Sequence, residues 1–192
     1  VGGAGHDVFN INGGALTGEI RGGKGSSLLN LTIGAGSIGR LRYIGGEGRD
    51  HITVNGGGEH YVTRYRVDGA GQESLSYTAP GGLDYELTYQ GISEVQDRVV
   101  ASHLELHGGA PTGEMTLRGN RFRVSGYSEL SFHNKHNLTL AASSQDHLQL
   151  EEEIDVPGTF EIRNARVSQG NAHAQINARR LVLNNVAGFG TA

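Results

Sequence analysis

The chain has 192 residues, and 32 of them are glycine, about one in six against roughly 7% in an average protein. With only 3 Pro and no Cys, a collagen, a Pro-rich linker and a disulfide scaffold are excluded. The 16 Lys and Arg against 20 Asp and Glu give a net charge of −4, which argues against binding to nucleic acid or anionic membranes by bulk electrostatics. No run of about 18 apolar residues is present to span a bilayer. The length suits one domain, and the composition argues against a helix-rich enzyme.

A repeat runs through the first part of the chain. Each copy is a glycine turn followed by a short strand whose apolar residues alternate, a pattern of period 2 that predicts β-strands. Counted from their first residues, the copies are spaced by 20, 23 and 23 residues. The four copies align without gaps and begin at Gly2, Gly22, Gly45 and Asp68.

The second half carries a weaker version of the same pattern. Short alternating apolar pairs are separated by polar corners, as in 104–106, 115–117, 122–124, 130–132, 138–140, 148–150, 160–162, 165–167, 176–178 and 181–183. A degenerate turn is expected at 141–146. Strands this short, joined by glycine turns, favour a parallel β-helix whose successive coils stack about 4.8 Å apart.

We therefore predict an all-β fold, a right-handed parallel β-helix (β-solenoid) of about nine rungs, one for roughly every 21 residues. Glycine suits the corners because they need positive φ and close approach between neighbouring coils. A β-sandwich with short strands is the structural alternative.

Residues 92–103 do not fit the repeat, because they contain no glycine. Ser93 and Gln96 have capping-box spacing, and Val95, Val99 and Val100 would share one helical face. This segment is expected to be a short helix or an extended connector. The predicted organisation is β-solenoid coils over 1–91, a connector over 92–103 and coils with degenerate corners over 104–192. Both ends read as if cut from a longer polymer, so we expect a piece of a much larger protein.

The glycine turns resemble the calcium-binding motif G-G-x-G-x-D of RTX proteins, in which turn carbonyls and the aspartates of stacked corners surround Ca²⁺. Asp7 and Asp50 stand at the aspartate position and are the calcium candidates, whereas Ser27 and Glu73 occupy it in the other copies. A calcium column needs consecutive aspartate corners, so we expect the glycines to serve backbone geometry, with no cofactor bound.

No catalytic motif is recognised, and we expect a protein that is not an enzyme. His133 and His136 form an H-x-x-H pair on an expected hairpin or corner, without an evident third ligand for zinc. The one carboxylate cluster comprises Glu151, Glu152, Glu153 and Asp155. Paired carboxylates serve glycoside hydrolysis, but neighbouring strand residues point to opposite faces, which favours a solvated acidic corner.

The runs 137–140 and 178–192 resemble the coils of filamentous-haemagglutinin-type adhesins and related large bacterial exoproteins. The stretch from Tyr89 through Val95 to residues 104–109 is similar to connectors between RTX-like glycine repeats in such proteins. The resemblance implies export through the outer membrane, often by a two-partner route, and a place in a long fibre or stalk. It carries over no ligand-binding residue.

The function expected from these observations is that of a structural and adhesive segment of a secreted bacterial surface exoprotein. Its expected partners are an outer-membrane export protein and an extracellular polysaccharide, a host-surface glycan or a host protein. A β-helix enzyme that degrades acidic polysaccharide, acting through the carboxylate cluster, is one alternative. A calcium-stiffened RTX-type module is the other.

Overall fold

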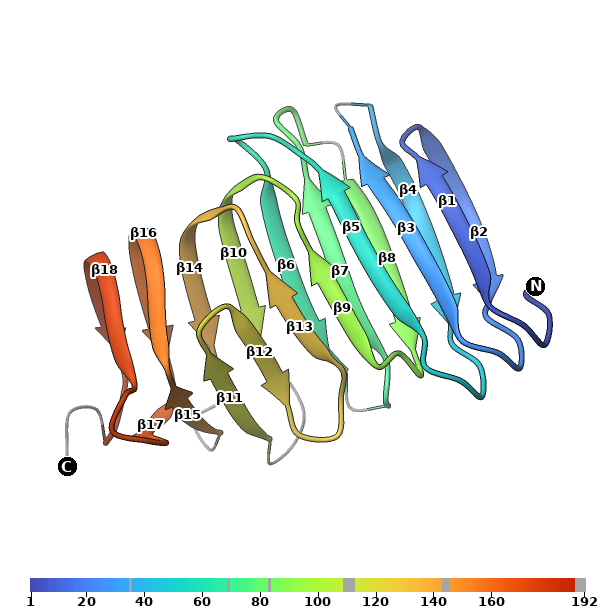
Figure 1. Ribbon diagram of the computed structural model, residues 1–192. Helices are drawn as coiled ribbons and strands as arrows, with labels where there is room; N and C mark the ends of the chain where they lie inside the picture. Colours follow the sequence, from blue (N-terminus) through green and yellow to red (C-terminus); the bar gives the residue numbers. More distant parts are fainter. Residues whose placement is uncertain (35, 69, 83, 109–112, 143–145, 189–192) are drawn as a thin grey trace.

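The computed structural model describes residues 1–192 except 35, 69, 83, 109–112, 143–145 and 189–192. The described part is all-β, with 18 strands and no helix, and its strands form two sheets of nine that face one another (Figure 1). No described helix is long and apolar enough to cross a membrane. The expected turn at 141–146 and the end of the run 178–192 include residues outside the described ones.

We name the two sheets by their strands, given in spatial order. Sheet I contains β1 (Asp7–Asn12), β3 (Ser27–Ile33), β5 (His51–Gly56), β9 (Glu94–Asp97), β13 (Glu129–Phe132), β12 (Arg121–Val124), β11 (Glu114–Arg118), β15 (His147–Glu151) and β17 (Arg166–Gln169). Sheet II contains β18 (Gln175–Asn184), β16 (Glu153–Arg163), β14 (Lys135–Ala141), β10 (Ala101–His107), β6 (Val62–Val67), β7 (Glu73–Thr78), β8 (Asp84–Gln90), β4 (Ile38–Ile44) and β2 (Ala15–Arg21).

At the N-terminal end the chain alternates regularly between the sheets. Strands β1 and β2 form one rung and β3 and β4 the next, with β1 parallel to β3 and β2 parallel to β4. Identical positions are therefore stacked: Phe9 pairs with Leu29, Leu29 with Ile52, and Ile52 with Val95. The expected repeat of corner and short strand is confirmed for the copies that begin at Gly2, Gly22 and Gly45.

Each sheet also contains one antiparallel meander, which interrupts the regular coil path. After β5 the chain enters sheet II at β6, two strand positions beyond the place next to β4. It then returns through the antiparallel strands β7 and β8, and β8 pairs with β4 in parallel. The other edge of β6 pairs in parallel with β10. Strands β11, β12 and β13 repeat this in sheet I, with β13 parallel to β9 and β11 parallel to β15. The sheets are mostly parallel, but the chain does not add one coil after another as predicted.

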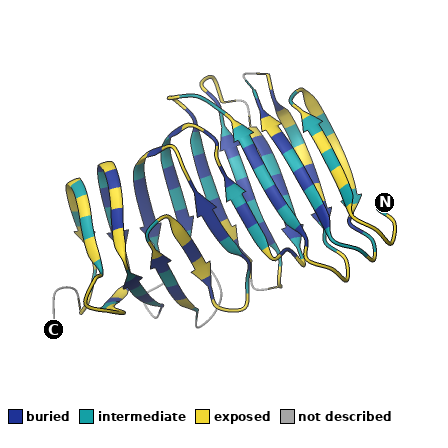
Figure 2. Cartoon of the chain, in the orientation of Figure 1, coloured by how far each residue is buried: buried dark blue, intermediate teal, exposed yellow. Residues whose placement is uncertain are grey.

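The core is a single apolar layer between the sheets (Figure 2). Alternate residues of each strand point into it, as in β7, where Glu73, Leu75 and Tyr77 are buried and the residues between them are not. Its largest side chains come from sheet II: Tyr43, Tyr65, Tyr77, Tyr85 and Tyr89 are fully buried. Burial of these apolar faces is the main force that holds the two sheets together.

The core is open at both ends of the stack. Leu181 and Leu183 of β18 pair with the buried Phe160 and Ile162 of β16, yet they remain 39% and 42% exposed. The terminal strands are correspondingly the least buried in Figure 2. Among the described residues no further strand covers them, so the apolar columns continue to the last strand and stop there uncovered.

Two local expectations differ from the structure. Of the two alternatives for residues 92–103, the helix is wrong: Val95 pairs in sheet I between β5 and β13, and the segment is extended, running through β9 into the start of β10. The fourth repeat copy is not a stacked corner but the hairpin between β6 and β7. There the Asp68 carboxylate accepts hydrogen bonds from the backbone N–H of Ala70 and Gln72, each at 3.0 Å. An Asx turn of this kind favours chain reversal.

Candidate functional site

The three remaining glycine corners lie directly on one another. The N–H of Lys24 donates to Gly3 O at 2.9 Å, and the N–H of Glu47 donates to Gly23 O at 3.3 Å. A Cβ added to Gly46 would overlap the carbonyl oxygen of Gly23 in the rung before. Glycine is thus required at Gly46 because the neighbouring backbone passes too close for any side chain.

Asp50 is fully buried inside this column of corners. One carboxylate oxygen accepts from Gly46 N at 2.6 Å, and the other accepts from Ser27 N at 2.8 Å and Ser27 Oγ at 2.5 Å. The half-buried Asp7 accepts from Gly3 N at 2.6 Å in the same manner. A cation needs carboxylate lone pairs, and three N–H and O–H donors already engage those of Asp50, whereas one N–H engages Asp7. The contacts give both aspartates a structural role, and the calcium role stays a prediction without support from this geometry.

A physical reason also explains why Ser27, and not an aspartate, occupies the rung between Asp7 and Asp50. The register aligns Asp7 with Ser27, and Asp50 follows Ser27 one rung further on. Successive rungs lie about 4.8 Å apart, where two carboxylates would repel each other. The hydroxyl of Ser27 instead donates to Asp50, so the break in the motif stabilises the stack.

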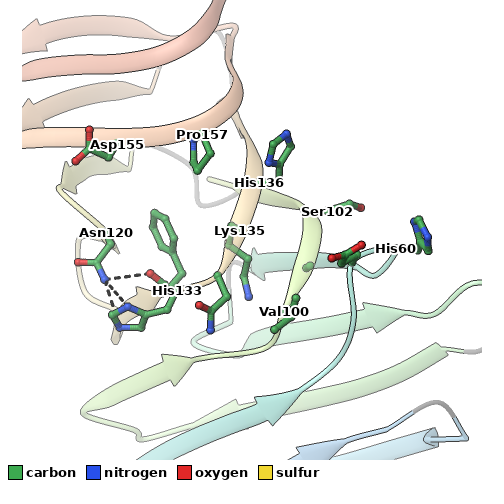
Figure 3. Close-up of a pocket in the computed structure, with 13 residues that line it drawn as sticks. His60, Val100, Ser102, Asn120, His133, Lys135, His136, Asp155 and Pro157 are labelled. Atoms are coloured by element: carbon green, nitrogen blue, oxygen red, sulfur yellow. Dashed lines mark hydrogen bonds between the residues drawn. The ribbon is translucent and has the colours of Figure 1, made fainter.

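A hollow of about 720 Å³ lies at the corner between β13 and β14 (Figure 3). His60, His133 and His136 all line it, together with Asp155 of β16. Asn120 Nδ2 donates to Phe132 O at 3.0 Å and lies 3.2 Å from Nδ1 of His133. Of the H-x-x-H pair, His133 is at the corner, whereas His136 is the second residue of β14. Within the described ranges no group of three His, Asp or Glu side chains is placed to hold a metal ion.

A buried ion pair lies at the side of this hollow. Lys135 Nζ is 3.0 Å from Asp97 Oδ2, and the two side chains are 3% and 0% exposed. The N–H of Val99 donates to Asp97 Oδ1 at 3.1 Å, and Lys135 also donates to Val99 O. Burial raises the pKa of Asp97 and lowers the pKa of Lys135, while their mutual attraction opposes both shifts.

Another buried carboxylate, Glu73, joins the two sheets. Its Oε1 accepts from Tyr65 Oη at 2.7 Å and from Ser128 Oγ at 2.6 Å, and its Oε2 accepts from Ser128 N at 3.2 Å. Burial, with Tyr89 and Glu73 nearby, raises the pKa of Tyr65 far above its ordinary value. Glu73 was expected at a degenerate calcium corner, but its hydrogen bonds fix β13 against the β6–β8 meander.

The outer face of that meander carries a groove of about 540 Å³, which we call the β7 groove. Short side chains form the floor of the groove, because Ser74, Ser76 and Thr78 are the outward residues of β7. Longer charged side chains stand on both sides: Arg64 and Arg66 from β6, and Asp84 and Glu86 from β8 with Arg40 from β4.

Ion pairs hold two of these arginines. Arg64 Nε is 2.8 Å from Glu105 and its Nη1 donates to Thr78 at 3.2 Å, while Arg40 Nε is 3.3 Å from Glu86. Among the described residues no ion pair involves Arg66, which is exposed. The groove therefore offers an unpaired guanidinium above a row of hydroxyl groups.

The predicted carboxylate cluster is divided by the fold. Glu151 lies in β15 of sheet I, whereas Glu153 and Asp155 lie on the outer face of β16 in sheet II. Glu152 is at the corner between them, with φ +62°, and is 2.6 Å from Arg118 Nε. Of the four, the alternation of β16 leaves Glu153 and Asp155 on one face, and Asn177 donates to Glu153.

Sequence reasoning missed the β7 groove and the Asp97–Lys135 pair. The groove has a signal in the sequence: Arg64 and Arg66, Ser74 and Ser76, and Asp84 and Glu86 all recur at period 2 on consecutive strands. The buried pair has none, because Asp97 and Lys135 are 38 residues apart and meet only through the tertiary fold. No protein-family model, curated protein or solved structure matches the chain.

Proposed function

We propose that the chain is a structural and adhesive segment of a secreted bacterial surface exoprotein of the filamentous-haemagglutinin type. In this proposal the stacked rungs form a shaft related to a right-handed parallel β-helix. The β7 groove of sheet II contacts an acidic extracellular polysaccharide. The resemblance of the coils and the open, mostly parallel stack support the shaft, and the groove supports the adhesive role.

The stack suits a shaft because its interactions repeat from rung to rung. Columns such as Phe9, Leu29, Ile52 and Val95 cross several strands in register, and each strand adds backbone hydrogen bonds to its neighbour. Solenoids gain stability from such nearest-neighbour contacts, so they can grow in length at constant width. Folding needs no disulfide, which suits a chain that is exported unfolded.

The groove is the observation that carries the adhesive part. Guanidinium groups bind carboxylates through paired, charge-assisted hydrogen bonds, and hydroxyl groups match the polar surface of a sugar. Arg66 is available for such a contact beside Ser74, its cross-strand partner. The volume is in the range of ordinary small-ligand sites, enough for a few sugar units of a longer polymer.

Titration of the chain with polygalacturonate in calcium-free buffer tests this function, with neutral dextran as the comparison polymer. We expect polygalacturonate to bind and to bind less at high salt. Arg66→Ser should weaken binding about fivefold, the equivalent of one exposed charged contact. The matched control is Arg123→Ser on the outer face of sheet I, also exposed, which should bind like the wild type.

Two results would overturn the adhesive proposal. One is equal affinity for dextran and polygalacturonate, and the other is equal loss in the two arginine variants. An assay for new reducing ends in the same incubation separates binding from hydrolysis. Their release, abolished by Asp155→Asn, would favour the polysaccharide-degrading alternative instead.

A further inference from the structure

The Asp97–Lys135 pair joins the two sheets at the centre of the stack. Asp97 is the last residue of β9 in sheet I, and Lys135 is the first residue of β14 in sheet II. Their 3.0 Å separation places the amine against the carboxyl group, with neither side chain open to bulk water. In an ion pair this deeply buried, the attraction between the two charges offsets only part of the solvation free energy that they lose on folding.

The surroundings offer few groups to stabilise those charges. The carboxylate accepts from Val99 N, and the amine donates to Val99 O. Tyr77 lies close enough to Asp97 for the carboxylate to raise the pKa of its phenol further, after burial itself. Burial shifts the pKa of Asp97 upward and that of Lys135 downward, and both shifts favour the neutral acid and the neutral amine. Those neutral forms are the ones that condense to an amide.

We propose that Lys135 and Asp97 form an intramolecular isopeptide bond between Nζ of the lysine and Cγ of the aspartate. The lone pair of the neutral amine attacks Cγ, and a C–N bond forms. The nitrogen loses a proton to the departing hydroxyl of the carboxyl group, the C–O bond breaks, and one water molecule leaves. Nothing is oxidised or reduced, and no co-reactant is needed.

The fixed positions of the two groups accelerate this step. Reacting groups that a fold holds in contact reach effective concentrations of about 10⁵ M or more, which offsets the low reactivity of a carboxylic acid. Lys135 also lines the hollow at the β13–β14 corner, which gives the released water a route to solvent. The bond would close a loop over residues 97–135 and tie sheet I to sheet II covalently.

Intact-mass spectrometry of the purified, denatured full chain tests the bond. The expected mass is lower than that of the sequence by one water molecule. Trypsin should then yield a branched species in which residues 67–98 are joined to residues 124–163, because cleavage after a modified Lys135 is blocked. Lys135→Arg and Asp97→Ala should each restore the full mass and lose the branched species.

Asp68 is followed by glycine, and a succinimide there would also remove one water molecule. Peptide mapping separates the two cases, because a succinimide leaves residues 67–98 unbranched and persists in Lys135→Arg. A folded wild-type chain that keeps its full mass after prolonged incubation would overturn the proposal, as would a water loss mapped to Asp68. The wild-type map decides the matter even if a variant does not fold, and it does so independently of the adhesive function proposed above.

Discussion

The two halves of the stack build their corners differently. In the first half, glycine occupies the corners, and Gly46 is needed because the carbonyl of Gly23 leaves no room for a Cβ, although its own φ is not positive. In the second half, Asn134, Glu152, Asn164 and Asn185 take up positive φ between +54° and +62°. Asparagine tolerates this region, and Asn185 Nδ2 donates to Asn164 Oδ1 at 2.9 Å. Close approach of a neighbouring rung therefore demands glycine more strictly than positive φ does.

The largest expected effect tests that difference directly. Gly46→Ala should destabilise the chain by about 3 kcal/mol, since its Cβ would overlap backbone that cannot move without displacing a rung. Gly3→Ala is the matched control, because Gly3 holds the same motif position and its Cβ would meet nothing. Urea unfolding of both variants measures the difference. Equal stability of the two would contradict the close-approach explanation.

The next effect concerns the carboxylate inside the glycine corners. Asp50→Ala leaves the buried N–H of Ser27 and the partly buried N–H of Gly46 without their acceptor, and we expect a loss of about 2–3 kcal/mol. Asp7→Ala removes a single hydrogen bond from the half-buried Asp7 to the exposed Gly3 and should cost about 1 kcal/mol or less. Thermal unfolding of the two variants measures which substitution lowers the stability more. A larger loss for Asp7→Ala would show that the buried column is not what stabilises the corners.

Side chains rather than corners make β10 sensitive to pH. Burial lowers the pKa values of His103 and His107 below 6.5, and Arg64 and Arg66 lower that of His107 further while Glu105 opposes them. The unfolded chain thus binds more protons below about pH 6.5, so stability falls as the pH drops from there toward the folded pKa values. We expect a lower urea midpoint at about pH 5.5 than at about pH 7.5. The double variant His103→Gln with His107→Gln should flatten that slope, and an unchanged slope would contradict this assignment.

A smaller effect is expected at the asparagine corners. Asn164→Gly retains the positive φ but loses the hydrogen bond from Asn185, so we expect a change of no more than about 1 kcal/mol in unfolding free energy. Asn164→Val, which cannot adopt this φ without strain, should cost more. If glycine and valine were equally tolerated, positive φ would not be the constraint at this corner.

The smallest effect is expected from metal removal. Because the oxygens of Asp50 already accept N–H and O–H donors, thermal unfolding in calcium and in excess chelator should give the same melting temperature. A melting temperature that is higher in calcium, and that Asp7→Ala or Asp50→Ala returns to its value in chelator, would favour the RTX-type interpretation.

The repeat in the first 56 residues was predictable because corners and alternating strands are local patterns, and the register from Asp7 to Val54 follows from them. The meanders were not predictable in the same way. A hairpin at Asp68 and a stacked corner share a glycine signature, and only long-range pairing of β8 with β4 distinguishes them. Buried charges such as Glu73 and Lys135 were missed because partners brought together by the tertiary fold leave no periodic signal.

The open stack should be able to grow in length rung by rung. Sedimentation velocity with small-angle X-ray scattering over a concentration series tests it most directly. We expect particles that lengthen with concentration at a constant cross-section, because no strand of the described residues covers the columns that end at Leu181 and Leu183. Leu183→Lys, which puts a charge on that open end, should keep the chain monomeric. A wild-type chain that stays monomeric at every concentration, or that thickens as it associates, would contradict the claim.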